Sequence, residues 1–161
     1  RYELIDGDLL GTPAPGVPHH LAVVELLFLL RPYVMQFGLG DALPAPADIE
    51  LDARSVLQPD LFVVPATVKF ARWSDVSSLL LAVEVVSPSS ARYDRVVKRQ
   101  FFQRHEVPEY WVVDVESRLI ERWRPADARP EIATDQLVWR PSRDAAALTI
   151  DLPALFDRVT R

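Results

Sequence analysis

The chain of 161 residues contains no cysteine. This absence excludes a disulfide framework, a thiolate nucleophile and a zinc site built on cysteine. It is typical of proteins from a reducing compartment, and we therefore expect a cytoplasmic location. Without cross-links the fold depends on a hydrophobic core, for which a chain of this length suffices. The length predicts one domain over residues 1–161.

Long apolar runs are also absent. The longest one near the start, Leu21–Leu30, is interrupted by Glu25. It has about half the length that a transmembrane helix needs. No secretory signal is recognisable. The 14 prolines outnumber the 5 glycines, and they punctuate loops without forming a repeat. The sequence therefore predicts no membrane partner.

Positive charge is in deficit, because 18 basic residues face 23 acidic ones and the formal net charge is −5. Such a chain does not bind nucleic acid tightly through overall charge alone. A divalent metal ion or a local basic face would offset the deficit. Arg92, Arg95 and Arg99 share one side of a predicted helix and are candidates for following a phosphate backbone. The alternative is a solvated helix surface that acids elsewhere balance.

The first third of the chain predicts a hairpin and a helix. Residues 2–10 alternate around Asp6-Gly7, a strong turn signal. A buried helix is expected from about His19 to Leu30, ending before Pro32. Strands are then expected at 48–52 and 58–64, and we predict that these two pair with each other.

The remaining two thirds predict further strands with helices between them. Strands are expected at 79–86, 109–114, 118–124, 137–139 and 148–150. A helix over 91–105 would bury the face that carries Tyr93, Val96, Val97 and Phe101, and 151–156 would form a short closing helix. The order of elements predicts an α/β or α+β fold with a mixed β-sheet.

A charged residue lies inside the strand that is otherwise most apolar. Leu79–Val86 is rich in β-branched residues and is followed by Ser-Pro, which is typical of a buried central strand, yet it contains Glu84. A buried carboxylate is costly unless it is paired, protonated or bound to a metal. Asp60 leads into another apolar strand, and Lys98 lies at the flank of the apolar face of the following helix. These three residues form a candidate site.

Two acids and a lysine on adjacent elements suit metal-assisted phosphodiester chemistry. Magnesium is commonly held by one or two carboxylates plus waters and substrate phosphate. Asp60, Glu84 and the main-chain carbonyl of Val85 are candidate ligands, and Lys98 would orient the nucleophilic water or stabilise the pentavalent phosphate. The alternative makes Asp60 a turn residue, Glu84 a solvated edge residue and Lys98 a solvated helix flank.

The same residues carry a resemblance to a known family. Gln58-Pro59-Asp60 and Glu84–Ser89 resemble the two acidic motifs of the PD-(D/E)XK restriction-endonuclease-like superfamily and, more narrowly, of the bacterial Uma-two family. The resemblance runs nearly end to end, through Tyr2–Leu9, His20, Asp94, Lys98, Val107–Asp114 and Asp151–Phe156. It implies a mixed β-sheet flanked by helices, with an N-terminal β-hairpin.

The resemblance also implies a nuclease that hydrolyses DNA with Mg²⁺ or Mn²⁺, in which Asp60 and Glu84 are the metal ligands. The superfamily lysine is expected two residues after the glutamate, where this chain has Val86. The family pattern assigns its role to Lys98 on the next helix. Glu3 would be an auxiliary acid near the metal.

The resemblance further implies that His20 lies beside the site or holds its water network. A homodimer is expected by analogy, since cutting both strands of a duplex needs two sites.

Two other functions stay open at this point. A catalytically silent, nuclease-like scaffold that binds nucleic acid or a protein partner would suit the net negative charge and the valine at position 86. A metal-dependent hydrolase of a small phosphorylated molecule is the third interpretation. A wide groove would favour the nuclease, and a small closed pocket the third interpretation. A large separation between Asp60 and Glu84 would favour the scaffold.

Overall fold

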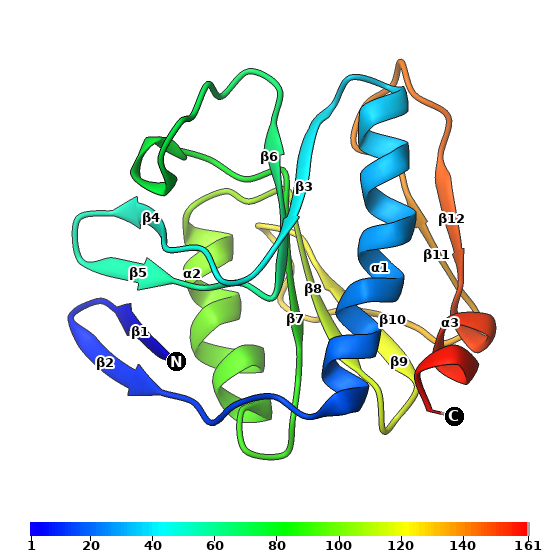
Figure 1. The fold of residues 1–161 in the computed structure, drawn as a ribbon, viewed down its shortest axis with the longest axis horizontal. Helices are drawn as coiled ribbons and strands as arrows, with labels where there is room; N and C mark the ends of the chain where they lie inside the picture. The colour runs from blue at the N-terminus through cyan, green and yellow to red at the C-terminus, as the bar shows by residue number, and fades with distance from the viewer. Residues whose placement is uncertain (161) are drawn as a thin grey trace.

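A mixed six-stranded β-sheet runs through the middle of the protein, between two layers of other elements (Figure 1). The computed structural model describes residues 1–160. The strand order is β10-β9-β8-β7-β6-β3, in which β7 and β8 are parallel and the other neighbours are antiparallel. The strands are β3 (Gly40–Pro44), β6 (Leu61–Pro65), β7 (Leu81–Val85), β8 (Glu109–Asp114), β9 (Leu119–Trp123) and β10 (Glu131–Ala133).

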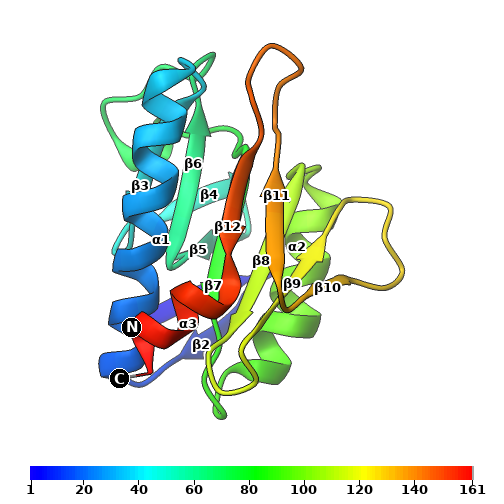
Figure 2. The same cartoon turned by 90° about the vertical axis from the view of Figure 1, so that its right-hand side faces the viewer.

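One face of this sheet is covered by helix α1 (Val17–Gln36), the ribbon of β11 (Gln136–Trp139) and β12 (Leu148–Asp151), and helix α3 (Leu152–Val159), as Figure 2 shows. Leu26, Leu30, Trp111 and Trp139 are buried in the core between these layers. Burial of this much apolar surface is the main stabilising term of the fold.

The opposite face carries the elements that build the site. A four-stranded sheet of order β2-β1-β5-β4 lies there beside a helix over residues 91–104. The helix contains a π-helical segment, η2 (Tyr93–Lys98), and continues as α2 (Arg99–Arg104). The smaller elements are β1 (Tyr2–Ile5), β2 (Asp8–Gly11), β4 (Ile49–Asp52), β5 (Ser55–Leu57) and the 3-10 turn η1 (Trp73–Asp75).

The predicted fold class is confirmed, as is the N-terminal hairpin, but one predicted pairing is wrong. Residues 49–52 pair with β5, whereas β6 pairs with β3 and β7. Strands β3, β5 and β10 lie in segments for which the sequence predicted no strand. β3 begins at Gly40, where a Cβ atom would lie 1.9 Å from the Val64 carbonyl oxygen. Glycine therefore permits this close strand contact, although it is a weak strand signal in a sequence.

Helix α1 also differs from its prediction, since it continues through Pro32 to Gln36. Proline removes one helical hydrogen-bond donor. Pro32 is exposed, so water can hydrate the carbonyl that lacks its partner. Within residues 1–160, no helix combines the length and the apolar character needed to cross a membrane.

Candidate active site

Asp60 and Glu84 face each other across two neighbouring strands. Glu84 lies within β7 and Asp60 directly before β6, and the two residues are 1% and 2% exposed. The register that pairs Leu61 with Val83 brings Asp60 opposite Glu84. Side chains of opposed residues point to the same side of a sheet. The Val85 N–H donates a 2.8 Å hydrogen bond to Asp60 Oδ2 and holds this carboxylate at the end of β7.

Lys98 reaches both the strand and the hairpin from its helix. Its Nζ lies 3.0 Å from Glu84 Oε1, 2.9 Å from Glu3 Oε2 and 3.5 Å from Asp94 Oδ1. The side chain is almost completely buried. Three carboxylates on one ammonium offset the cost of taking these charges out of water. The lysine that the sequence placed on the following helix therefore contacts Glu84.

The buried face of this helix is only in part the one predicted. Asp94, Lys98, Phe101 and Phe102 are buried, while Val96 and Val97 are 39% and 36% exposed. The prediction assumed that apolar residues would mark the inner face. Here the charged residues turn inward because Glu3 and Glu84 provide their partners.

Glu3 holds the hairpin against Lys98. Its Oε1 accepts a 2.7 Å hydrogen bond from the Gln58 N–H, and its Oε2 forms the ion pair with Lys98. The structure places Glu3 against Lys98, as a group that positions the ammonium. The role of Glu3 as an auxiliary acid near a metal stays a prediction.

The imidazole in contact with Asp60 belongs to His19. Its Nε2 lies 3.0 Å from Asp60 Oδ2. The neighbouring His20 is exposed, and its ring stands edge-on to that of His19 with 6.0 Å between centroids. Adjacent residues on a helix point about 100° apart. α1 is apolar on nearly every side, so its sequence does not reveal which of the two histidines faces the site.

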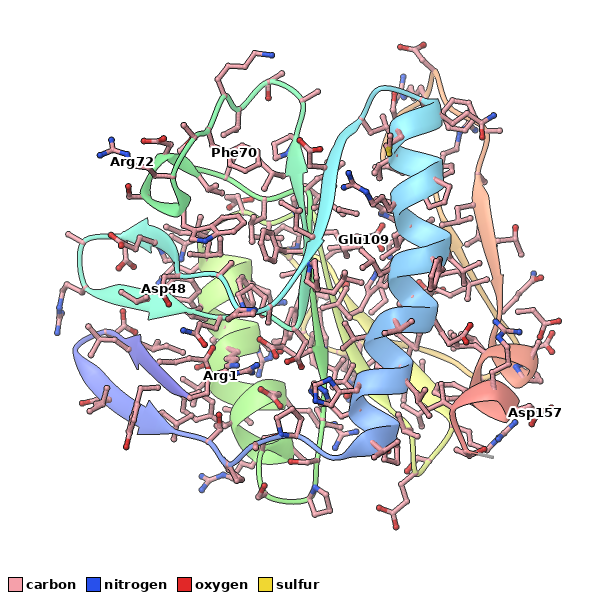
Figure 3. All side chains as sticks on the ribbon, viewed as in Figure 1. Arg1, Asp48, Phe70, Arg72, Glu109 and Asp157 are labelled. Carbon is pink, nitrogen blue, oxygen red and sulfur yellow. The ribbon has the colours of Figure 1, made fainter. Side chains whose placement is uncertain are left out.

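Arg1 is a further contact that sequence reasoning missed. Its guanidinium donates a 3.1 Å hydrogen bond to Asp60 Oδ1. In Figure 3 its labelled side chain lies between the hairpin and the lower end of α1. No sequence motif predicts this contact, because it depends on how the hairpin docks onto the rest of the fold.

The pKa values of the two acids diverge. Burial alone would raise the pKa of Asp60, but the hydrogen bond and charge of His19, together with Arg1 and the Val85 N–H, hold it well below its ordinary value. Burial raises the pKa of Glu84 well above its ordinary value, with Lys98 opposing and neighbouring carboxylates adding to the rise. Divergent pKa values of adjacent acids are typical of functional sites.

Lys98 is held as a cation. Burial alone would lower its pKa, but the carboxylates of Glu84, Asp94 and Glu3 raise it above its ordinary value. The ammonium therefore donates hydrogen bonds and supplies positive charge. It is not suited to accept a proton at neutral pH.

These groups face an open pocket of about 150 Å³. Its rim is formed by the segment 12–16 and by the serines of 87–90, and its floor includes Asp60, Glu84, Asp94 and Lys98. The pocket has room for several water molecules. The carboxylates are thus buried from bulk solvent but remain reachable by a small group.

The groups in and around the pocket are mainly acidic, which suits a divalent cation. Four carboxyl groups (Glu3, Asp60, Glu84 and Asp94) lie around two permanent cations, Lys98 and Arg1. Yet within residues 1–160 no three histidine, aspartate or glutamate side chains form a ready metal site. Lys98 occupies the space between three of the acids.

Asp60 and Glu84 nevertheless fit a magnesium or manganese ion as a pair. Ions of this class commonly bind through one or two carboxylates and keep several waters. Both residues line the pocket, and the main chain of Val85 lies beside them. The role of the Val85 carbonyl as a third ligand stays a prediction.

Most of the predicted basic row is engaged in contacts within the protein. Arg95 is bound to Asp114 at 2.8 Å and to Glu121 at 2.6 Å. The guanidinium of Arg99 lies 4.6 Å from the ring centroid of Trp123. Arg92 is exposed. Two of the three arginines therefore serve contacts within the protein.

The mixed sheet, its flanking helices and the facing carboxylates define a protein of the restriction-endonuclease-like class. The chain belongs to the Uma2 family, described as "Putative restriction endonuclease", which matches residues 1–153. The expectation drawn from the motifs is thereby confirmed at the level of family and fold.

A solved structure shows the same fold at low sequence identity. It is described as a putative nuclease belonging to DUF820 from Anabaena variabilis ATCC 29413. The two chains share 16% identity with a TM-score of 0.77, over 98% of this chain and 90% of the other. No curated protein matches the chain.

Proposed function

We propose that this protein is a nuclease that hydrolyses phosphodiester bonds of DNA with the help of Mg²⁺ or Mn²⁺. The observation that carries the proposal is the position of Asp60 opposite Glu84, with the ammonium of Lys98 3.0 Å from Glu84 at the floor of one pocket. Membership of the Uma2 family supports the same reaction class.

Each group has a defined task in this proposal. Asp60 and Glu84 would hold the ion, which when bound lowers the pKa of water and neutralises charge on the phosphate. Lys98 donates hydrogen bonds to the attacking water or to a phosphate oxygen, which stabilises the charge that develops there. Because the neighbouring carboxylates raise the pKa of Lys98, we assign it the role of a donor and not that of a general base.

Glu3 and Asp94 keep the ammonium of Lys98 in place. Glu3 is anchored by the Gln58 N–H and therefore gives Lys98 a fixed partner. Asp94 approaches from the preceding turn of the same helix. Cutting a duplex on both strands would need two such sites, and a homodimer is the arrangement we propose by family analogy.

The alternative is a nuclease-like scaffold without activity. The observation that favours it is the lack, within residues 1–160, of three side chains ready to hold a metal. The measurement below separates the two.

Plasmid cleavage in Mn²⁺ tests the proposal. We expect the wild-type protein to cut, and Asp60→Asn and Lys98→Met to lose at least about a hundredfold in rate. Glu131→Gln, a substitution outside the pocket, is the matched control and should cut like wild type. Calorimetry should show Mn²⁺ binding that Asp60→Asn weakens. A wild-type protein that neither cuts DNA nor binds Mn²⁺ would establish the silent scaffold.

A further inference from the structure

A second pocket lies directly beside the first. It has a volume of about 210 Å³ and shares Arg1, Pro15, His19 and Asp60 with the catalytic pocket. Asp60, together with its partners Arg1 and His19, therefore lies between the two pockets. We call the pocket with Glu84 and Lys98 the inner pocket and the other the outer pocket.

The walls of the two pockets differ in chemistry. The inner pocket is lined by carboxylates, Lys98 and serines. The outer pocket adds His20, Val23, Ala45 and Pro46 to the shared residues. Apolar side chains with an exposed imidazole offer a surface on which a flat aromatic ring can stack. Together, the inner and outer pockets thus match a phosphate group joined to a nucleobase.

The depth of the inner pocket argues against a paired nucleotide. Asp60, Glu84 and Lys98 are each no more than 2% exposed, beneath the rim formed by 12–16 and 87–90. A base that is paired and stacked in a duplex cannot enter a side pocket. Enzymes that need such access act on single strands or rotate the nucleotide out of the helix.

The surface charge points the same way. Duplex binding draws most of its affinity from lysine and arginine contacts to phosphates. Arg95 and Arg99 are engaged inside the protein, and the net charge is −5. Single strands, by contrast, also gain affinity from stacking of bases on side chains.

We propose that the outer pocket is a nucleobase subsite, and that the substrate is an unpaired strand whose base next to the scissile phosphate stacks on His20. This inference rests on the proposed nuclease function and names its substrate class. It gives the exposed His20 a role in substrate binding, separate from the contact of His19 with Asp60.

Cleavage of a short labelled oligonucleotide in Mn²⁺ is the first test. The probes are the single strand, the same strand in a duplex, and single strands with one abasic position moved stepwise along the sequence. We expect the single strand to be cut at least about tenfold faster than the duplex. His20→Ala should raise KM about tenfold with little change in kcat. An abasic position beside the cut should have the same effect, and His20→Ala should add little to it.

Phe28→Ala is the matched control, because Phe28 is an aromatic residue of the same helix, is 73% exposed and lines neither pocket. It should leave cleavage unchanged, and circular dichroism should show that both variants are folded. Equal cutting of duplex and single strand, with no effect of His20→Ala, would overturn the inference while leaving the nuclease intact.

Binding separates this inference from the catalytic proposal. Fluorescence anisotropy with Ca²⁺ in place of Mn²⁺ measures affinity for the same oligonucleotides without relying on cleavage. Tighter binding of the single strand that His20→Ala weakens and Phe28→Ala does not would support the subsite even for a protein that cuts nothing. Affinity that is equal for both forms and insensitive to His20→Ala would count against it.

Discussion

Two buried cations of this protein, Lys98 and Arg122, differ in the charge balance of their surroundings. Lys98 is 1% exposed and Arg122 is 6% exposed, and each is bound to carboxylates. Arg122 donates to Glu131 through two nitrogens at 2.9–3.2 Å, approaches Glu109 at 3.5 Å and also donates to the Val138 carbonyl. It thereby joins β8, β9, β10 and β11.

The two centres differ in charge balance. Around Arg122, the carboxylates of Glu109 and Glu131 face the guanidinium groups of Arg122 and Arg124. Hydrogen bonds from Arg122 lower the pKa of Glu131. Around Lys98 the carboxylates are in excess, and burial raises the pKa of Glu84. A balanced centre stabilises the fold, whereas an unbalanced one beside a pocket is a candidate functional site.

Removing each cation should have the largest effect on stability and should show most clearly how the two centres differ. Lys98→Met leaves buried acids without their partner, so we expect the free energy of unfolding to fall by about 3–5 kcal/mol at pH 7. Mn²⁺ should restore part of this loss, because the ion supplies the missing positive charge. Urea titrations with and without Mn²⁺ measure both effects.

The matched variant for this test is Arg122→Met, which should also be destabilised but should gain nothing from Mn²⁺. Equal rescue of both variants would show that the two centres do not differ in the way described.

Neutralising an acid in the unbalanced centre should have a smaller effect of the opposite sign. Glu84→Gln removes a carboxylate whose ionised form is disfavoured by burial. We therefore expect the free energy of unfolding at pH 7 to rise by about 1 kcal/mol, while Mn²⁺ binding is lost. Urea unfolding and calorimetry check the two parts. A clear loss of stability would contradict this prediction and would mean that the Glu84 carboxylate stabilises the fold.

The same change in the balanced centre should give the smallest effect. Glu131 is 53% exposed, so solvent screens its ion pair, and Glu131→Gln should cost about 0.5 kcal/mol at neutral pH. Its pKa is lowered in the folded state, so its contribution is present above the ordinary value of 4.5 and is lost as the pH falls below it. Urea unfolding at pH 7 and pH 3 should show the difference only at pH 7.

The two acids of the candidate site could be predicted from sequence because each breaks a local pattern. Glu84 interrupts an apolar strand, and Asp60 begins one. The helix that carries Lys98 was also predicted, but its inner face was predicted only in part: Phe101 is buried, whereas Val96 and Val97 are not. Val96 and Val97 look like inner residues until the acids of the hairpin and of β7 are known, and these come from distant parts of the chain.

Contacts that depend on how distant elements dock could not be predicted from the sequence. The choice of His19 over His20 depends on the rotation of a helix that is apolar nearly all round, and the contact of Arg1 with Asp60 depends on the docking of the hairpin. The pairing of β4 with β5 was missed because β5 is only three residues long. The carboxylates thus reveal the site, while the groups that position them depend on the fold.

The hairpin ties the beginning of the chain to a compact unit in its middle. Glu84 and Lys98 are only 14 residues apart and belong to one strand–helix–strand unit around the parallel pair β7–β8. Glu3 joins them from the opposite end of the chain. The entropy cost of closing such a loop rises only slowly with its length, by about 0.6 kcal/mol for each doubling. The docked hairpin thus adds a third carboxylate beside Glu84 and Asp94, and the charge of Lys98 offsets the repulsion among the three.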